Sequence, residues 1–317
     1  MTGEDLFLRV ECYVGLRRAL GYVVRSEEKL LKDFVRFVQA QAIAGPIRAQ
    51  MALDWACAPS SGRGLSGQAS RLKVVRRFLS HLQAAIPETE VPALGMLGKL
   101  RRPKPYLYAP QQIEQLLAKA SLLKPKGSLR SHTYTTMIGL IASTGLRVGE
   151  AIRLTVRDVH LKADPAYLEV LQTKFRKSRL VALHSTTADK LRLYARQRKH
   201  HYDDGLSEAF FISEKGTHLH YAAVRRTFSS LTRLAGIRND TDKARPCIHG
   251  LRHAFAVERM LEWYRCGLPV NDLLPTLSVY MGHVQPAQSY WYLSATPELL
   301  TVAGERFQNF ANQGADQ

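Results

Sequence analysis

Prolines set among basic residues divide the chain into two parts. Four prolines interrupt the helical pattern between residues 87 and 108: Pro87, Pro92, Pro103 and Pro105. The same segment carries a cluster of basic side chains: Lys99, Arg101, Arg102 and Lys104. Spaced prolines with clustered charge indicate an extended linker, because proline fixes φ and lacks a backbone donor. The sequence therefore predicts an N-terminal domain over residues 1–86, a basic linker over residues 87–108 and a second domain over residues 109–317.

Apolar residues recur at spacings of three and four through the first domain. One series is Tyr13, Leu16 and Leu20, and a later one begins with Leu72 and Val75. Such spacing places the apolar side chains on one face of a helix, where they can be buried. We therefore expect a small helical bundle in the N-terminal domain.

The net charge indicates the kind of partner. The chain has 45 lysines and arginines against 27 acidic residues, a formal charge of +18 over 317 residues. A field of this sign attracts polyanions and repels most basic proteins. A membrane surface would also attract it, but no segment has the roughly 18 uncharged apolar residues of a spanning helix. The acidic start, Glu4-Asp5, is unlike a signal peptide. We expect a cytoplasmic, nucleoid-associated protein without a membrane partner.

A turn with glycine and arginine follows an apolar helix in the middle of the chain. The apolar run Met137 to Ala142 predicts the helix, and Gly145 is placed to end it with a left-handed cap. Arg147 follows this turn, and Glu150 stands three residues beyond it. We expect Glu150 to orient the Arg147 side chain.

Two β-rich runs flank a basic turn. The runs are Tyr167–Leu171 and Arg179–Leu183, and the turn between them contains Lys174 and Lys177. This arrangement predicts a β-hairpin.

A third motif combines histidine and arginine at a helix start. His249 and Arg252 are three residues apart, so one helix face can present both to one ligand. The start of a helix also favours a bound phosphate. His249 and His253 could hold zinc, but the chain lacks the glutamate of the His-Glu-x-x-His motif and an evident third ligand. We therefore expect no metal and no cofactor.

The fourth motif contains the candidate nucleophile. The pair Gly282-His283 is followed by Tyr290 and Tyr292. A deprotonated tyrosine can attack phosphorus and keep the bond energy as an ester, while the planar fork of arginine holds phosphate oxygens. Arginines, histidines and a tyrosine are the groups needed to cleave a DNA phosphodiester without metal.

In residues, order and spacing, the four motifs resemble those of the tyrosine recombinase, or phage integrase, family. The resemblance is to a two-domain member of Xer-like or transposon type. It covers the second domain by motifs and the first hundred residues by arrangement only. It implies a mainly α fold, with a SAM-like, helical core-binding domain and a mixed α+β catalytic domain that contains a small β-hairpin or sheet.

The resemblance also implies the role of each site residue. Arg147, Arg252 and His283 would bind the scissile phosphate, with Glu150 and His253 supporting them. Tyr292 would attack, since it lies nine residues after His283. His249 would accept its proton, and Lys174 would protonate the leaving 5′ oxygen. Tyr290 stays an alternative nucleophile, because Pro286, Ala287 and Gln288 replace the threonine-rich turn common in the family.

Double-stranded DNA is the implied partner. The family forms a 3′-phosphotyrosyl intermediate and exchanges strands through a four-way junction, in a tetramer on DNA. The tail, residues 297–317, would dock either on a neighbouring subunit or on its own domain. The expected contacts to the DNA backbone are made by basic residues of the last bundle helix, the linker and the hairpin: Arg71, Lys73, Arg76, Arg77, Arg101, Arg102, Lys104, Lys177 and Arg179.

Two other functions fit the same sequence. A type IB topoisomerase shares the chemistry but relaxes a single duplex. A DNA-binding architectural or regulatory protein could keep the fold without catalysis, although every catalytic position is filled here.

Overall fold

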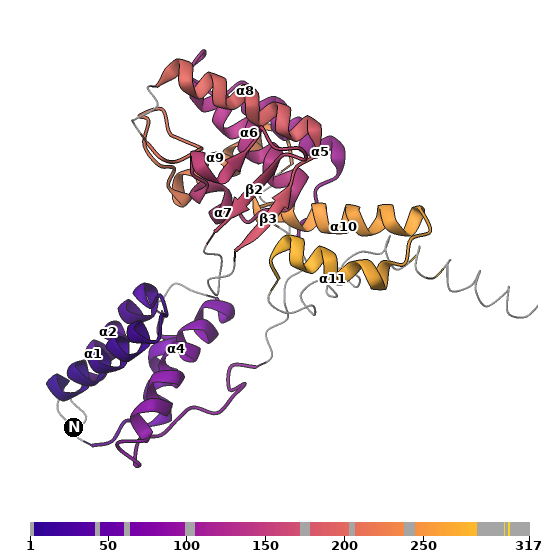
Figure 1. Cartoon of the computed structure of the whole chain (residues 1–317). Coiled ribbons are helices and arrows are strands. Elements are labelled where there is room, and N and C mark those ends of the chain that lie inside the picture. Colours follow the sequence, from indigo (N-terminus) through magenta and orange to yellow (C-terminus); the bar gives the residue numbers. More distant parts are fainter. Residues whose placement is uncertain are drawn as a thin grey trace, which may run out of the picture. The chain divides into compact units, whose positions relative to one another are not determined.

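The chain forms two compact units, Met1–Arg102 and Pro103–Gln317 (Figure 1). The computed structural model describes residues 3–41, 45–59, 64–98, 105–171, 178–202, 207–237 and 245–283, together with residues 301 and 304. Helices dominate both units, and the second unit adds a small antiparallel sheet. The predicted fold class, mainly α with a mixed catalytic domain, is confirmed.

The first unit is a helical bundle. Its helices are α1 (Gly3–Ala19), α2 (Arg25–Ala40), α3 (Ala49–Cys57) and α4 (Leu65–Gln83). Aromatic rings meet edge to face in its core, with Phe34 and Trp55 centroids 5.4 Å apart. Tyr13 is buried as predicted, but Leu16 and Leu20 are 47% and 64% exposed. Leu16 lies in the last turn of α1, and Leu20 directly follows the helix.

The bundle extends beyond residue 86, the predicted end of the domain. Val91 and Leu97 pack against the core of the bundle. Glu90 also fastens this segment, because its carboxylate accepts a hydrogen bond from the backbone of Ala49 at 2.9 Å and pairs with Arg48 at 2.6 Å. Residues 87–98 therefore belong to the bundle and do not form the extended linker that was predicted there. Residues 99–104 lie outside the described residues.

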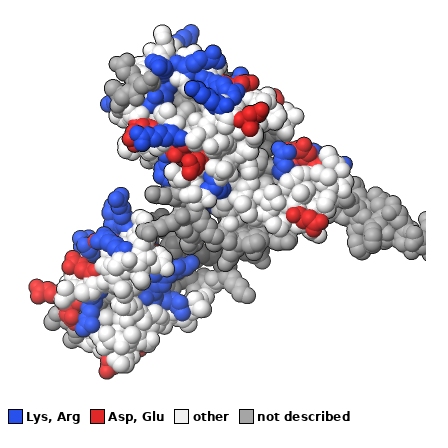
Figure 2. Space-filling model, in the orientation of Figure 1, with Lys and Arg blue, Asp and Glu red and all other residues white. Residues whose placement is uncertain are grey.

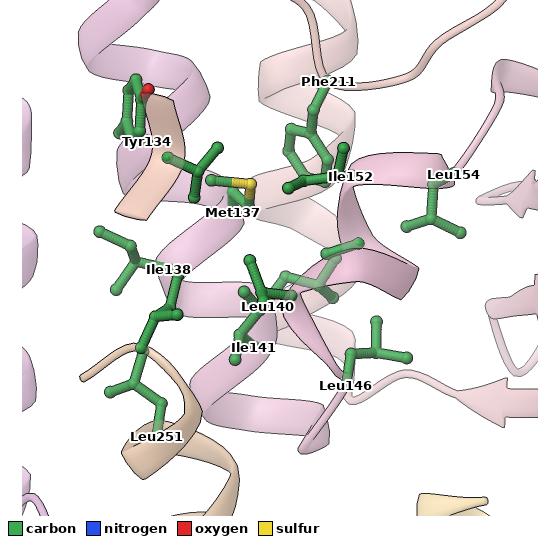
Figure 3. Packing of buried hydrophobic residues seen from close by; sticks show 14 of the residues in the cluster. Tyr134, Met137, Ile138, Leu140, Ile141, Leu146, Ile152, Leu154, Phe211 and Leu251 are labelled. Carbon is green, nitrogen blue, oxygen red and sulfur yellow. The ribbon is translucent and has the colours of Figure 1, made fainter. Parts of the chain in front are cut away.

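The second unit is built around one buried helix. Its helices are α5 (Pro110–Ser121), α6 (Leu129–Thr144), α7 (Val148–Arg153), the 3-10 turn η2 (Val156–Asp158), α8 (Ser185–His201), α9 (Tyr221–Leu234), α10 (His249–Arg265) and α11 (Val270–Met281). α6 contacts α5, α8 and α10. Its Met137, Ile138, Leu140 and Ile141 are all at most 1% exposed, and Leu251 of α10 packs beside them (Figure 3). The end of α6 is thereby held firmly in place.

The sheet has three antiparallel strands in the order β1 (Val159–His160), β2 (Tyr167–Val170) and β3 (Arg179–Ala182). β2 and β3 form the predicted hairpin, with Leu168 opposite Val181. Both of these side chains are fully buried, whereas Leu180 on the other face of β3 is 63% exposed. β1 was not predicted, because two residues are too few to show alternation.

Candidate active site

The end of α6 is shaped by Gly145. This residue caps the helix in the left-handed conformation, with φ 64° and ψ 19°, as the sequence predicted. A Cβ at this position would lie 2.5 Å from Cδ1 of Phe255 on α10. Only glycine therefore allows α10 to approach the turn this closely. The turn then delivers Arg147 to the start of α7.

Glu150 holds Arg147 at two points. One carboxylate oxygen accepts the backbone N–H of Arg147 at 3.0 Å, and the other accepts its Nη1 at 2.7 Å. Nη2 of Arg147 donates to the carbonyl of Gly282 at 2.8 Å. The Arg147 side chain is 28% exposed, whereas that of Glu150 is 2% exposed. The arginine is thus oriented by a buried carboxylate while part of its guanidinium stays accessible.

Arg179 of β3 binds the same carboxylate. Its Nη2 lies 2.8 Å from Oε2 of Glu150 and its Nη1 lies 3.3 Å from Oε1. Its Nε donates to the carbonyl of Tyr280 at 2.7 Å. The side chain is 9% exposed. The predicted contact of Arg179 with the DNA backbone is therefore corrected, because the guanidinium is turned inward. Strand alternation could have indicated this, since Arg179 shares a face with buried Val181.

The charge of Glu150 is set by its two arginines. Burial raises the pKa of this carboxyl, but the hydrogen bond and charge of Arg179, together with the bonds from Arg147, outweigh it and bring the pKa to about 2. Glu150 is consequently ionised at neutral pH and balances one of the two guanidinium charges.

Arg252 approaches from α10 and is 1% exposed. Its Nη1 donates to the carbonyl of Gly145, and its Nη2 donates to the carbonyl of Met281 at 2.7 Å. One guanidinium therefore joins the end of α6 to the end of α11.

The start of α10 also carries the two histidines of the third motif. The rings of His249 and His253 lie 4.6 Å apart and nearly perpendicular. Gly250 between them has no room for a side chain, since a Cβ would lie 2.7 Å from the carbonyl oxygen of Tyr106 and 2.8 Å from Cε2 of Tyr108. The extended segment that leads into α5 thus crosses directly over the start of α10.

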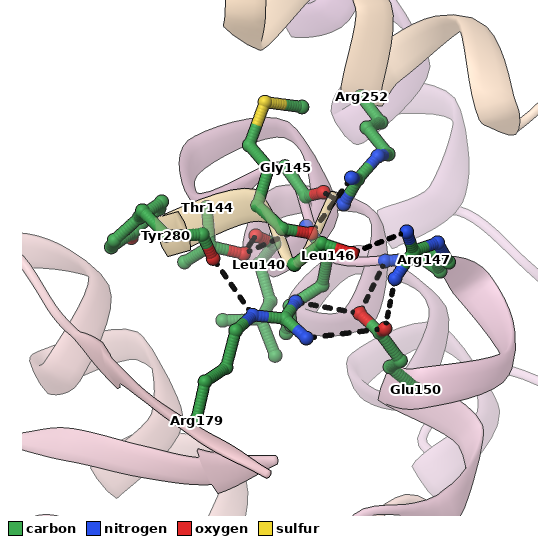
Figure 4. Close-up of polar contacts among 11 residues, drawn as sticks. Leu140, Thr144, Gly145, Leu146, Arg147, Glu150, Arg179, Arg252 and Tyr280 are labelled. Atoms are coloured by element: carbon green, nitrogen blue, oxygen red, sulfur yellow. Dashed lines mark hydrogen bonds and ion pairs between the residues drawn. The ribbon is translucent and has the colours of Figure 1, made fainter. Parts of the chain in front are cut away.

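Three arginines meet at the C-terminal end of α11 (Figure 4). The last carbonyls of a helix have no partner within it and carry its negative dipole end. Here Tyr280 accepts from Arg179, Met281 from Arg252 and Gly282 from Arg147. Glu150 is the carboxylate that pairs with Arg147 and Arg179, and the charges of all three arginines act on the neighbouring His283. Such a site favours an anion.

His283 follows this helix end. Burial lowers its pKa, and the charges of Arg252, Arg147, Arg179 and His253 lower it further, to about 3. The imidazole is therefore neutral at pH 7 in the free protein. The structure thus brings Arg147, Arg252 and His283 together around the end of α11.

Other predicted site residues lie outside the described residues. These are Lys174, Lys177, Tyr290, Tyr292, most of the tail 297–317, and the linker residues Arg101, Arg102 and Lys104.

Arg71 of α4 is a further correction. It is 7% exposed, its guanidinium lies 3.8 Å from the centroid of the Trp55 ring, and it bonds to the carbonyl of Trp55 and to Asp33. It was predicted to contact the DNA backbone, but it is part of the bundle core.

The other basic residues of α4 differ in exposure. Lys73 and Arg77 are exposed, and Arg77 lies 3.4 Å from Glu27. Arg76 is half-buried and donates to the carbonyl of Pro92 at 2.8 Å. Lys73 and Arg77 therefore remain open to a ligand from solvent.

Neither a metal site nor a membrane-spanning helix is present in the described part of the chain. It contains no group of three or more His, Cys, Asp or Glu side chains placed to hold a metal ion. None of its helices is both long enough and apolar enough to cross a membrane.

Comparisons with known proteins agree on one family. The profile of the Phage integrase family matches residues 107–298. The integrase/recombinase y4rB of Sinorhizobium fredii is 39% identical over 305 residues, which cover 94% of this chain and 96% of that protein. A tyrosine recombinase of Pseudothermotoga lettingae is 29% identical over 70% of this chain and 72% of its own. The crystal structure of the XerH site-specific recombinase bound to palindromic difH substrate, a post-cleavage complex, has a similar fold. Its TM-score is 0.67 at 18% identity, over 90% of this chain and 80% of that chain.

Proposed function

This chain belongs to the phage integrase family and is a site-specific recombinase, and from that premise we propose that it cleaves and rejoins DNA through a 3′-phosphotyrosyl intermediate. The observation that carries the proposal is the convergence of three guanidiniums on the end of α11, two of which pair with Glu150. Such a cluster suits a DNA phosphate, which is an anion with several acceptor oxygens.

Arg147, Arg252 and His283 form the phosphate clamp in this proposal. Charge on the non-bridging oxygens grows as the phosphorus becomes five-coordinate, and fixed donors stabilise it without reorganising. Arg147 is partly exposed and Glu150 already orients it, so it can add a phosphate contact without losing its support. Removing one such donor typically lowers the rate by about 10²- to 10³-fold.

Tyr292 attacks the phosphorus in line. A tyrosine has an ordinary pKa of about 10, so its hydroxyl must lose a proton, and nearby guanidinium charge favours the phenolate. His249 accepts that proton. The Tyr292 oxygen forms a bond to phosphorus while the bond to the 5′ oxygen breaks, and Lys174 donates a proton to the departing 5′ oxygen.

Strand exchange then needs no external energy source. A 5′ hydroxyl from a second duplex attacks the phosphotyrosyl bond, releases Tyr292 and rejoins the strand. Two such rounds pass through a four-way junction, and we propose that a tetramer on DNA carries them out. The tail 297–317 would dock in this assembly either on a neighbouring subunit or on its own domain.

Positive charge supports double-stranded DNA as the partner. The faces visible in Figure 2 carry more lysine and arginine than acidic residues. Exposed Lys73 and Arg77 on α4 are available for phosphates, as are the basic residues of the linker in this proposal. A chain with a net charge of +18 would remain bound to chromosomal DNA in the cell, which supports location at the nucleoid.

A nicked suicide substrate tests this function. Cleavage beside the nick releases a short strand, so the covalent protein–DNA adduct is trapped and migrates slowly in a denaturing gel. We expect an adduct in EDTA that Tyr290→Phe keeps and Tyr292→Phe loses. The reverse pattern would identify Tyr290 as the nucleophile. No adduct on a cognate site would favour an architectural protein, and an adduct with relaxation but no strand exchange would favour a topoisomerase.

A further inference from the structure

We infer that Arg179 is a positioning residue for DNA cleavage, which fixes Glu150 and the end of α11 and through them sets the places of Arg147 and His283. This inference rests on the proposed function, because it concerns the geometry of the phosphate clamp. Arg179 itself does not contact the phosphate in this account.

The Arg179 guanidinium binds Glu150 and the end of α11 at the same time. Its two terminal nitrogens bind the two oxygens of Glu150, at 2.8 and 3.3 Å, while Nε binds the carbonyl of Tyr280 at 2.7 Å. One planar group therefore joins the carboxylate that orients Arg147 to the helix end that precedes His283. A lysine ammonium is a single point of charge and cannot make this fork.

Gly282 gives independent support. It caps α11 with φ 69°, and a Cβ there would lie 2.6 Å from Nη1 and 2.9 Å from Cζ of Arg179. The guanidinium therefore lies against the backbone of the residue immediately before His283. A side chain at residue 282 would need both this space and the left-handed backbone, so Arg179 and the backbone together favour the glycine of the Gly-His pair.

Tyr280 provides a second link between β3 and α11, which offers a matched control. Its hydroxyl donates to the carbonyl of Ala182 at 3.1 Å, at the opposite end of β3 from Arg179. Replacing Tyr280 by Phe removes this hydrogen bond but leaves the bonds of Arg179 and Glu150 in place. The variant therefore separates a general loosening of the contact between β3 and α11 from the loss of the guanidinium.

Loss of Arg179 has defined consequences in the clamp. Glu150 keeps Arg147 as its partner among the described contacts, the Tyr280 carbonyl loses a donor, and Gly282 loses the group against which it lies. The Gly282 carbonyl also accepts a hydrogen bond from Arg147, so movement of the helix end shifts both Arg147 and His283. A displacement of about 1 Å in a catalytic arrangement can reduce the rate by about 10²-fold.

The test compares full-length wild type with Arg179→Ala, Arg179→Lys and Tyr280→Phe. For each protein we would measure the melting temperature, DNA affinity and the single-turnover rate of adduct formation on the suicide substrate. We expect both Arg179 variants to bind DNA within a few-fold of wild type and to cleave it about 10²-fold more slowly. Tyr280→Phe should cleave at close to the wild-type rate.

Two further readouts distinguish positioning from a structural role. Millimolar guanidinium should restore part of the cleavage by Arg179→Ala, because it can enter the vacated space beside Glu150. As the pH is lowered, cleavage by this variant should also be lost at a higher pH than cleavage by wild type. The reason is that Glu150 remains buried but loses the partner that most lowers its pKa. If Arg179→Ala does not fold, Arg179→Lys, which keeps a charge beside Glu150, decides the test.

Failure of the inference about Arg179 and failure of the proposed function give different results. Wild-type cleavage rates in Arg179→Lys and Arg179→Ala would overturn the inference alone, as would equal losses in Tyr280→Phe and Arg179→Lys. A wild-type protein that forms no adduct would instead overturn the proposed function, and with it the inference.

Discussion

At the scale of single residues, backbone carbonyls organise the site as much as charged side chains do. Arg147, Arg179 and Arg252 each donate to one carbonyl at the end of α11. The motifs predicted the arginines and Glu150, since those residue types are visible in the sequence. They did not predict the carbonyl acceptors, because every residue has one and only the fold decides which is reached.

The site strongly alters the protonation of His283. Its pKa of about 3 means that the folded protein keeps it neutral at pH values where the unfolded chain, with a pKa of about 6.5, binds a proton. Protonation therefore favours the unfolded state. The stabilising contribution of neutral His283 is present above about pH 6.5 and declines as the pH falls below it.

Titration of His283 by NMR checks this assignment. We expect its ring resonances, identified by their absence in His283→Gln, to remain those of a neutral imidazole down to pH 5 in the free protein. Binding of a phosphate should raise the pKa, because the anion offsets the neighbouring guanidinium charge. A midpoint near pH 6.5 without any ligand would contradict the burial and charge that the site imposes on this ring.

At the scale of elements, glycines set how closely α6, α10 and α11 approach. Gly145 lies against the Phe255 side chain of α10, and Gly282 lies against the Arg179 guanidinium of β3. The sequence predicted the left-handed cap at Gly145, because an apolar helix precedes it. The closeness of α10 could not be predicted, since it depends on residues more than a hundred positions away.

Gly250→Ala tests the contact at the start of α10. Its Cβ would lie 2.7 Å from a backbone oxygen of Tyr106, so either the helix or the entering segment must shift. Overpacking of this kind costs about 1–3 kcal/mol of unfolding free energy, and we expect cleavage to fall with it.

Gly139→Ala is the matched control for Gly250→Ala. Within α6 its Cβ would meet only Cδ2 of Leu117, at an ordinary 3.8 Å, so the variant should gain about 0.5–1 kcal/mol from helix propensity. Denaturant unfolding measures both variants. Equal stability of the two would refute the close approach at Gly250.

At the scale of the whole molecule, composition predicted a polyanionic partner but not which basic residues are available to it. Arg71 and Lys73 are close neighbours in the sequence of α4, yet Arg71 is buried against Trp55 and Lys73 is exposed. The domain boundary shows the same limit. Prolines predicted a linker from residue 87, whereas Glu90 and Val91 attach that stretch to the bundle.

Salt dependence of DNA binding distinguishes these two basic residues. Lys73→Gln should leave the melting temperature unchanged and reduce the slope of log affinity against log salt by about 1, as for one lost phosphate contact. Arg71→Gln should keep the slope and lower the melting temperature, because it removes a buried ring contact and hydrogen bonds. A lower slope with Arg71→Gln would mean that this residue reaches DNA.

The amino acid that becomes linked to DNA identifies the nucleophile, and the linked phosphate identifies the polarity of cleavage. The covalent adduct, formed in EDTA, would be digested with nuclease and trypsin and sequenced by mass spectrometry. Cleavage by trypsin after Arg265 and Arg306 leaves residues 266–306 as one peptide that contains both candidate tyrosines. We predict a nucleotide joined through its 3′ phosphate to Tyr292. A 5′ linkage, or attachment to a residue other than tyrosine, would contradict the account.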